Sequence, residues 1–198
     1  ALVVQRPASS FEGTAEETFR HHLLHQVTYE GVPRSVRREG HARVATWLAE
    51  RARAGEHLAA TAEHYLQAGD HVQAARWLCD AMDHALARFD NVTAIAHGQR
   101  ALELAGDGEL ALQWRAHMAM ARAADVLSNR ELHVACAAAM ERLAAAEGAD
   151  PAWAGRSRYT RANLLFRQGR IDEALRAGTE AAAACEAAGH TFTAAEAH

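Results

Sequence analysis

The chain contains no lysine, so all 21 of its basic residues are arginines. A phosphate-binding P-loop needs a lysine that reaches the β- and γ-phosphates of a nucleotide, so that ATP site is excluded from these 198 residues. The arginines are outnumbered by 25 acidic residues, which gives a formal net charge of −4. A chain of this charge has no overall attraction for phosphate backbones, and nucleic acid is not the expected partner.

Cysteine and long apolar runs are also scarce. Cys79, Cys136 and Cys185 are isolated from one another and form no C-x-x-C pair, which argues against a zinc site and against a disulfide framework. We expect each thiol to fill a gap between helices. No run of about eighteen apolar residues is available to span a bilayer, and the N-terminus does not resemble a signal peptide. The sequence predicts a soluble, cytoplasmic protein without a membrane partner.

What the sequence does contain is a series of turn-like breaks that recur at intervals close to twenty residues. They are Gly69-Asp70, Phe89-Asp90, Gly106-Asp107-Gly108, Ser128-Asn129, Gly148-Ala149-Asp150, Gly169-Arg170 and Gly189-His190. Segments rich in Ala and Leu, each of about helix length, lie between the breaks. Two segments with their turns make a unit of about forty residues, which predicts an all-α solenoid of stacked helix pairs.

Two of these segments carry apolar residues at steps of three and four, which is typical of a one-sided helix. The first set is Val72, Ala75, Cys79, Met82 and Leu86, and the second is Ile171, Ala174, Leu175, Gly178, Ala181, Ala182 and Cys185. Such a helix cannot bury its apolar face alone, so we expect each face to pack against a neighbour. Trp77, Trp114 and Trp153 are expected to fill the wider gaps.

The first quarter of the chain has a different pattern. The stretches 2–5 and 17–19 predict a small β-hairpin, and helices are expected over 20–29, 35–53 and 56–68. We therefore divide the chain into residues 1–54 and a repeat region over 55–198. The last five residues carry no helix stop signal, so we expect the helical array to continue past them. The 198-residue chain alone would then expose an apolar face, and we expect it to self-associate.

The stretch from Gly169 to Leu175, continued to Ala181 and preceded by Ala162 and Leu165, resembles the tetratricopeptide (TPR) signature, in which a small residue on one helix faces two alanines on the next. The residues around Gly69 are similar to it. The breaks at Phe89, Asn129 and Gly169 are 40 residues apart, against about 34 in the usual repeat, so we expect TPR-like antiparallel helix pairs with lengthened helices. The predicted repeat-packing residues are Ala62, Tyr65, Ala74, Ala81, Ala94, Ala101, Ala162, Leu165, Ala174 and Ala181.

One expected unit, from about residue 109 to 147, departs from this pattern. Arg122 stands where a small residue is expected, and no clean pair of alanines follows Asn129. Its two helices are predicted from periodicity alone.

The stretch Phe19-Arg20-His21-His22-Leu23-Leu24-His25-Gln26-Val27-Thr28-Tyr29-Glu30, followed by residues 37–45, resembles a segment of large bacterial signalling ATPases. These include adenylate/guanylate-cyclase-linked and LuxR- or MalT-like transcriptional regulators, in which such an element ends a winged-helix region and leads into TPR-like repeats. The resemblance gives structural roles to Phe19, Arg20, His21, Tyr29 and His41, with His21 bonding at the start of a helix. In that family the nucleotide site and the output domain lie elsewhere in the chain. The resemblance implies that this chain is a sensor or docking arm.

No motif for catalysis or cofactor binding is present. His21, His22 and His25 are the one candidate metal cluster, but His22 occupies the position of the glutamate in the H-E-x-x-H motif. The sequence therefore predicts a non-catalytic scaffold without metal or cofactor. It would bind a protein, a peptide, another domain of the parent chain or a small effector on a concave face lined by the first helix of each pair. The alternative is a metal-dependent hydrolase that uses the three histidines.

Overall fold

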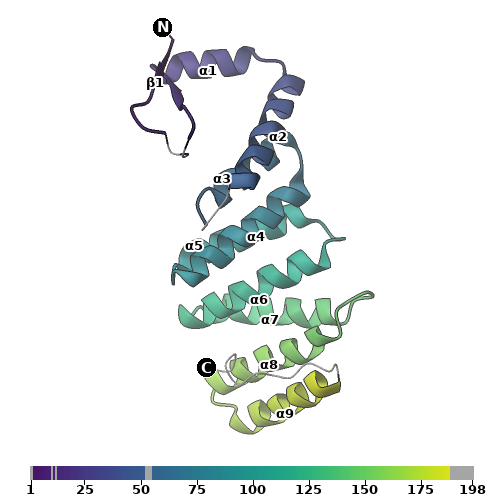
Figure 1. The fold of residues 1–198 in the computed structure, drawn as a ribbon. Coiled ribbons are helices and arrows are strands. Elements are labelled where there is room, and N and C mark those ends of the chain that lie inside the picture. Colours follow the sequence, from purple (N-terminus) through teal and green to yellow (C-terminus); the bar gives the residue numbers. More distant parts are fainter. Residues whose placement is uncertain (1, 10, 12, 52–54, 188–198) are drawn as a thin grey trace.

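The computed structural model describes residues 2–9, 11, 13–51 and 55–187. Within these residues the chain is mostly helical, with nine helices and one two-stranded hairpin (Figure 1). The elements are β1 (Val3–Gln5), β2 (Glu17–Phe19), α1 (His22–Gly31), α2 (Arg34–Arg51), α3 (Leu58–Ala68), α4 (His71–Ala87), α5 (Asn91–Ala105), α6 (Leu110–Val126), α7 (Arg130–Ala144), α8 (Ala152–Arg167) and α9 (Ile171–Ala187). The predicted helical class and the N-terminal hairpin are confirmed.

The hairpin and α1 form the N-terminal end of the molecule (Figure 1). The strands pair antiparallel, with Val3 opposite Phe19. The helix predicted over 20–29 corresponds to α1, but none of its residues is buried, and on one face of it the side chains of Leu23 and Val27 are 69% and 62% exposed. The helix contacts only the hairpin and a few residues of α2, so no neighbour covers this face in the described part of the chain.

Helices α2 and α3 start the main row of helices. α2 buries Ala45 and Leu48 but leaves Val36 and Val44 exposed. α3 begins at Leu58, two residues after the predicted start, because His57 has a left-handed backbone (φ 67°) that cannot continue a helix.

From α2 to α9 each helix packs against the helix before it and the helix after it (Figure 1). Beyond these neighbour contacts, α4 also touches α6. The strongest packing within the row joins α4 to α5 and α8 to α9, whereas α7 and α8 contact each other least among neighbours. The result is an elongated row of helices in which the core runs between successive helices.

Four of the turns in this row share one hydrogen-bonding pattern. A residue with a left-handed backbone donates its N–H to the carbonyl three residues back (2.9 to 3.1 Å), and the next N–H bonds to the carbonyl five residues before it (2.8 to 3.0 Å). This is the Schellman motif, which ends a helix by satisfying its last carbonyls. The left-handed residues are Gly69, Phe89, Ser128 and Gly169. The six predicted breaks from residue 69 to residue 170 all connect helices, and the seventh, at Gly189-His190, lies outside the described residues.

The residue after the left-handed position also starts the next helix in three of these turns. The side chains of Asp70, Asp90 and Asn129 each accept a hydrogen bond from the N–H three residues on, at 3.0 to 3.1 Å. Such an N-cap satisfies one of the free donors of the first helical turn. Each break therefore stops one helix and starts the next within two residues.

Small residues occupy the helix faces that meet. The fourth and eleventh positions after the N-cap residue are alanines in three helices, and all six are buried: Ala74, Ala81, Ala94, Ala101, Ala174 and Ala181. At the centre of α5, a Cβ atom on Gly98 would lie 2.8 Å from Met120 Cγ and 3.0 Å from Met82 Sδ, so three helices approach closely there. The predicted stripe on α9 is partly wrong, because Ile171 and Leu175 are 48% and 66% exposed while the alanines of that helix are buried.

Larger side chains fill the remaining gaps. The indole rings of Trp114 and Trp153 stack with their centroids 4.7 Å apart and their planes within 2° of parallel, which joins α6 to α8. Trp77 packs at the edge of the cluster around α4 and α5. All three cysteines are buried and unpaired, as predicted. No helix of the described residues has both the length and the apolar character needed to cross a membrane.

Burial raises the pKa of the thiols of Cys79 and Cys136 to about 11. Only about one part in ten thousand of each thiol is then the reactive thiolate at pH 7. We expect a maleimide to leave both residues unmodified in the folded protein and to modify both in denaturant, as mass spectrometry of the digested protein can establish. Modification of either cysteine under native conditions at the rate of a free thiol would contradict this packing.

Candidate functional site

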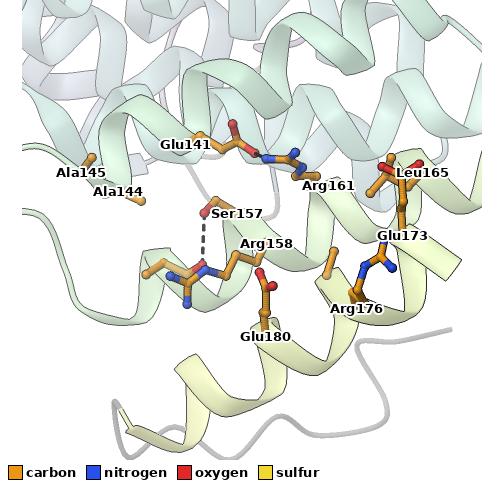
Figure 2. A pocket seen from close by; sticks show the side chains of 12 residues that line it. Glu141, Ala144, Ala145, Ser157, Arg158, Arg161, Leu165, Glu173, Arg176 and Glu180 are labelled. Atoms are coloured by element: carbon orange, nitrogen blue, oxygen red, sulfur yellow. Dashed lines mark hydrogen bonds and ion pairs between the residues drawn. The ribbon is translucent and has the colours of Figure 1, made fainter. Parts of the chain in front are cut away.

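A cavity of about 430 Å³ lies between α7, α8 and α9 (Figure 2). It occurs next to the loosest neighbour contact of the row, between α7 and α8, where the connection has seven residues (145–151), against three in the turns at 88–90, 127–129 and 168–170. Its uncharged lining comes from Ala144, Ala145, Ala154, Ser157, Leu165 and Ala177. The small size of these side chains leaves the space open.

Six charged side chains surround this cavity, three of each sign. They are Arg158, Arg161, Arg176, Glu141, Glu173 and Glu180. Arg161 of α8 donates to Glu141 of α7 at 3.3 Å, and Figure 2 shows these two side chains directed toward each other. Glu173 accepts a hydrogen bond from Arg170 at 2.7 Å, which lowers the pKa of its carboxyl group.

The remaining charges of the cavity have free hydrogen-bonding capacity. Arg158 and Arg176 form no hydrogen bond or ion pair with another described residue, and they come from the two helices that face each other across the cavity. Glu180 of α9 adds an acceptor at the same place. Because donors and acceptors alternate around the space, the cavity can bind a group that carries charges of both signs, such as a segment of peptide.

An ion-pair cluster joins α4 to α6, which are two helices apart in the row. Arg115 of α6 donates to Asp80 at 2.7 Å and to Asp83 at 2.9 and 2.6 Å. These hydrogen bonds raise the pKa of the Arg115 guanidinium against the opposing effect of burial. The cluster fixes the spacing of the two helices.

Three of the five family-motif residues belong to one chain of ring contacts at the N-terminal end. The Phe19 ring contacts the His25 ring, which stacks on Tyr29, and the guanidinium of Arg37 lies 4.8 Å from the centre of the Tyr29 ring. Tyr29 Oη lies 2.8 Å from His41 Nε2. These contacts connect the hairpin, α1 and α2.

The chain continues from α2 to α3 through two histidines. His41 Nδ1 lies 2.8 Å from His64 Nδ1, so one nitrogen must donate a proton and the other must accept it. If Tyr29 donates to Nε2 of His41, the proton on His41 sits on Nδ1 and is donated to His64. A proton on Nδ1 of His64 would then place two donors against each other and break the bond.

The other two motif residues have different surroundings. Arg20 is exposed and contributes its backbone N–H, which donates to Leu2 O at 3.0 Å. His21 is the N-cap of α1 but its side chain makes no capping hydrogen bond, so its predicted role in starting the helix through the imidazole is wrong. Its backbone carbonyl accepts from Leu24 and His25 instead.

The ten predicted repeat-packing residues lie at helix contacts. Nine of them are buried and Tyr65 is half-buried. Ala62 and Ala101 belong to the cluster around α4 and α5, and Leu165 lies with Ala162 and Ala174 between α8 and α9.

The three histidines of the candidate metal cluster are not assembled as ligands. His22 and His25 have ring centres 6.3 Å apart, and both are exposed. Across the described residues, no group of three or more His, Cys, Asp or Glu side chains is arranged to hold a metal ion.

Sequence reasoning missed His64, Arg115 and all the charged residues of the cavity. His64, Arg115 and Arg161 contact partners on other helices, and the other charged residues come together only because three helices surround one cavity, so a single sequence reveals neither arrangement. The break at Gly148 gave the one available signal, because a longer connection there separates α7 from α8.

Burial is the largest cause that holds the pKa of four imidazoles, His64, His97, His117 and His133, below the ordinary value of 6.5. Near pH 6 the unfolded chain therefore binds more protons than the folded chain, so stability falls as the pH drops below about 6.5. We expect the free energy of unfolding, measured by urea titration from pH 7.5 to 5, to decline as the pH falls, and His64→Gln to make that decline shallower. His71→Gln, which changes an exposed histidine on α4, is the control and should leave the slope unchanged; an unaltered slope in His64→Gln would overturn the assignment.

No protein-family model, no curated protein and no solved structure matches the chain. The function is therefore inferred from the contacts described above.

Proposed function

We propose that this chain is a non-catalytic interaction scaffold, in which TPR-like helix pairs of about forty residues form a solenoid that binds a protein, a peptide or a small effector. The pairs are α4 with α5, α6 with α7, and α8 with α9. The carrying observation is that all three pairs have the same turn, a Schellman motif, at Phe89, Ser128 and Gly169. These residues are 39 and 41 positions apart.

The packing between helices supports the same division. The contact between the two helices of each pair is richer than the contact with the following pair. Connections between pairs are longer, at 106–109 and 145–151. In addition, α4 contacts α6, as expected if the first helices of successive pairs line a common face. In a one-dimensional array of this kind every pair adds surface for a partner without adding a central core.

Two surfaces can carry the partner. The predicted concave face would be lined by α4, α6 and α8, and the Arg115 ion-pair cluster lies on it. The cavity between α7, α8 and α9 is the better supported site, because it has volume and free donors on Arg158 and Arg176. We therefore propose that a peptide segment with both acidic and basic groups binds there.

The N-terminal resemblance supports the proposal that this scaffold belongs to a bacterial signalling or transcriptional regulator. The contacts of Phe19, Tyr29 and His41 connect the hairpin to α2 and from there, through His64, to the row. In such a regulator the scaffold would act as a sensor or docking arm for other domains of the parent chain, in the cytoplasm. The coupling through His41 and His64 is the physical link between the two parts.

A phage-displayed library of random peptides, selected on the folded protein, tests this function. We expect the selected peptides to carry acidic and basic residues, and the variant Arg158→Gln/Arg176→Gln to weaken their binding about tenfold or more, because each charge-assisted hydrogen bond contributes about 1.5 to 3 kcal/mol. Fluorescence anisotropy with the synthetic peptides gives the dissociation constants.

The matched control is Arg88→Gln/Arg100→Gln, which removes two arginines from the surface of α4 and α5. It should leave the dissociation constants unchanged, and circular dichroism should show that both double variants are folded. Failure to select any peptide, or equal binding by all three proteins, would contradict the assignment of this cavity.

A further inference from the structure

The helices that follow the four Schellman turns provide an internal comparison. Measured from the N-cap position at residues 70, 90, 129 and 170, the residue four positions on is Ala74, Ala94, His133 and Ala174. All four are buried, and three are alanine. The packing of this fold therefore requires only a methyl group at this position. Packing alone does not explain why a histidine is buried there in α7.

The residue four positions before the N-cap also differs from its equivalents in this same turn. It is Leu66, Leu86, Asp125 and Phe166 in chain order, so that an acid replaces an apolar side chain only before α7. Asp125 Oδ1 lies 3.9 Å from His133 Nδ1, and Asp125 Oδ2 accepts from Arg167 of α8 at 2.9 Å. The two unusual residues of this turn, His133 in place of alanine and Asp125 in place of an apolar residue, thus lie close together. Residues that depart from the local sequence pattern without stabilising the fold are concentrated at functional sites.

These residues line a recess of about 170 Å³ between the α6/α7 turn and α8. The polar lining comes from Ser128, Arg130, His133, Arg167 and Asp125. His133 is only 5% exposed, yet its imidazole makes no hydrogen bond within the described residues. Its nearest charged group, the Asp125 carboxylate, lies 3.9 Å away, which is too far for a hydrogen bond, so a bound ligand would use the free hydrogen-bonding capacity of the imidazole.

The recess has spare positive charge. The side chain of Arg130 forms no hydrogen bond or ion pair with the other described residues, and Arg167 uses one of its N–H groups on Asp125. The positive N-terminal end of α7 lies at the same place, because Asn129 is its N-cap. The groups that face His133 are Asp125 from α6, Arg167 from α8 and Arg130 from its own helix.

We propose that this recess binds an oxyanion, a carboxylate or phosphate group, held by Arg130, Arg167 and the imidazole of His133. Asp125 bonds to Arg167 and holds it at the site, and its negative charge offsets the positive charge of a protonated His133. The two arginines and the protonated histidine still exceed this one negative charge, and a bound anion supplies the negative charge that the site lacks. A bound anion favours the protonated imidazole, and for this reason binding strengthens as the pH falls. The site is separate from the α7/α8/α9 cavity and does not depend on the peptide function proposed there.

Titration with inorganic phosphate and, separately, with acetate tests the site. We expect the imidazole NMR signals of His133, assigned by their loss in His133→Ala, to move to saturation with one of the two anions and its pKa to rise. Sodium chloride at equal ionic strength should not produce this change. Arg130→Gln should weaken binding about tenfold, since it removes a charge-assisted hydrogen bond.

His133→Ala gives the sharpest result, because it restores the residue of the three equivalent positions. We expect this variant to keep the unfolding temperature of the parent in the absence of anion and to lose the increase in unfolding temperature that the anion gives the parent. Arg158→Gln, in the other cavity, should retain that increase. If neither anion exceeds the effect of sodium chloride, or if the increase survives in both Arg130→Gln and His133→Ala, the proposal is wrong.

Discussion

Close approach of successive helices through alanine and glycine is the constraint on which the rest of the structure depends. An alanine buries little apolar area by itself, so a helix with an alanine face is stable only where a neighbour comes near the lower end of the usual 8–10 Å separation. Ala94, Gly98 and Ala101 make α5 such a helix, and Met82 and Met120 meet over Gly98. The order of the helices in space therefore follows their order in the chain.

Polar groups take over where this packing ends. At the N-terminal end, Tyr29, His41 and His64 connect α1, α2 and α3 by hydrogen bonds, while the apolar residues Leu23 and Val27 stay exposed. Between α7 and α9 a looser contact leaves a charged cavity, and in the α6/α7 turn Asp125 and His133 replace apolar residues. The candidate sites are thus the places where the repeat of small residues is interrupted.

The helices and their ends could be predicted because each depends on neighbours in the sequence. Gly69-Asp70 and Ser128-Asn129 each combine a residue that tolerates a left-handed backbone with an N-cap residue. Two adjacent residues of the sequence are therefore enough to predict such a turn. The inward face of α9 was harder, since Ile171 and Leu175 fit the period as well as the alanines do. Only the close packing of α8 against α9 selects the small residues over the large ones.

The sites could not be predicted for a related reason. Glu141 and Arg161 are 20 residues apart, and Asp125 and Arg167 are 42 apart, so their contacts depend on how helices far apart in the sequence pack together. One trace was present in the sequence, because the unit from about 109 to 147 lacks the expected alanines. His133 stands where one of these alanines is expected. Only the structure shows that this histidine is buried, which makes it a candidate binding residue.

The most direct measurement of the central claim compares the substitution of leucine for a buried and an exposed alanine of the same helix. Ala101 is 1% exposed and faces the neighbouring helices, whereas Ala96 is exposed to solvent. If close approach through small residues stabilises the row, Ala101→Leu should lower the free energy of unfolding by about 1–3 kcal/mol, and Ala96→Leu should change it by less than about 0.5 kcal/mol. Equal effects of the two substitutions would contradict the account.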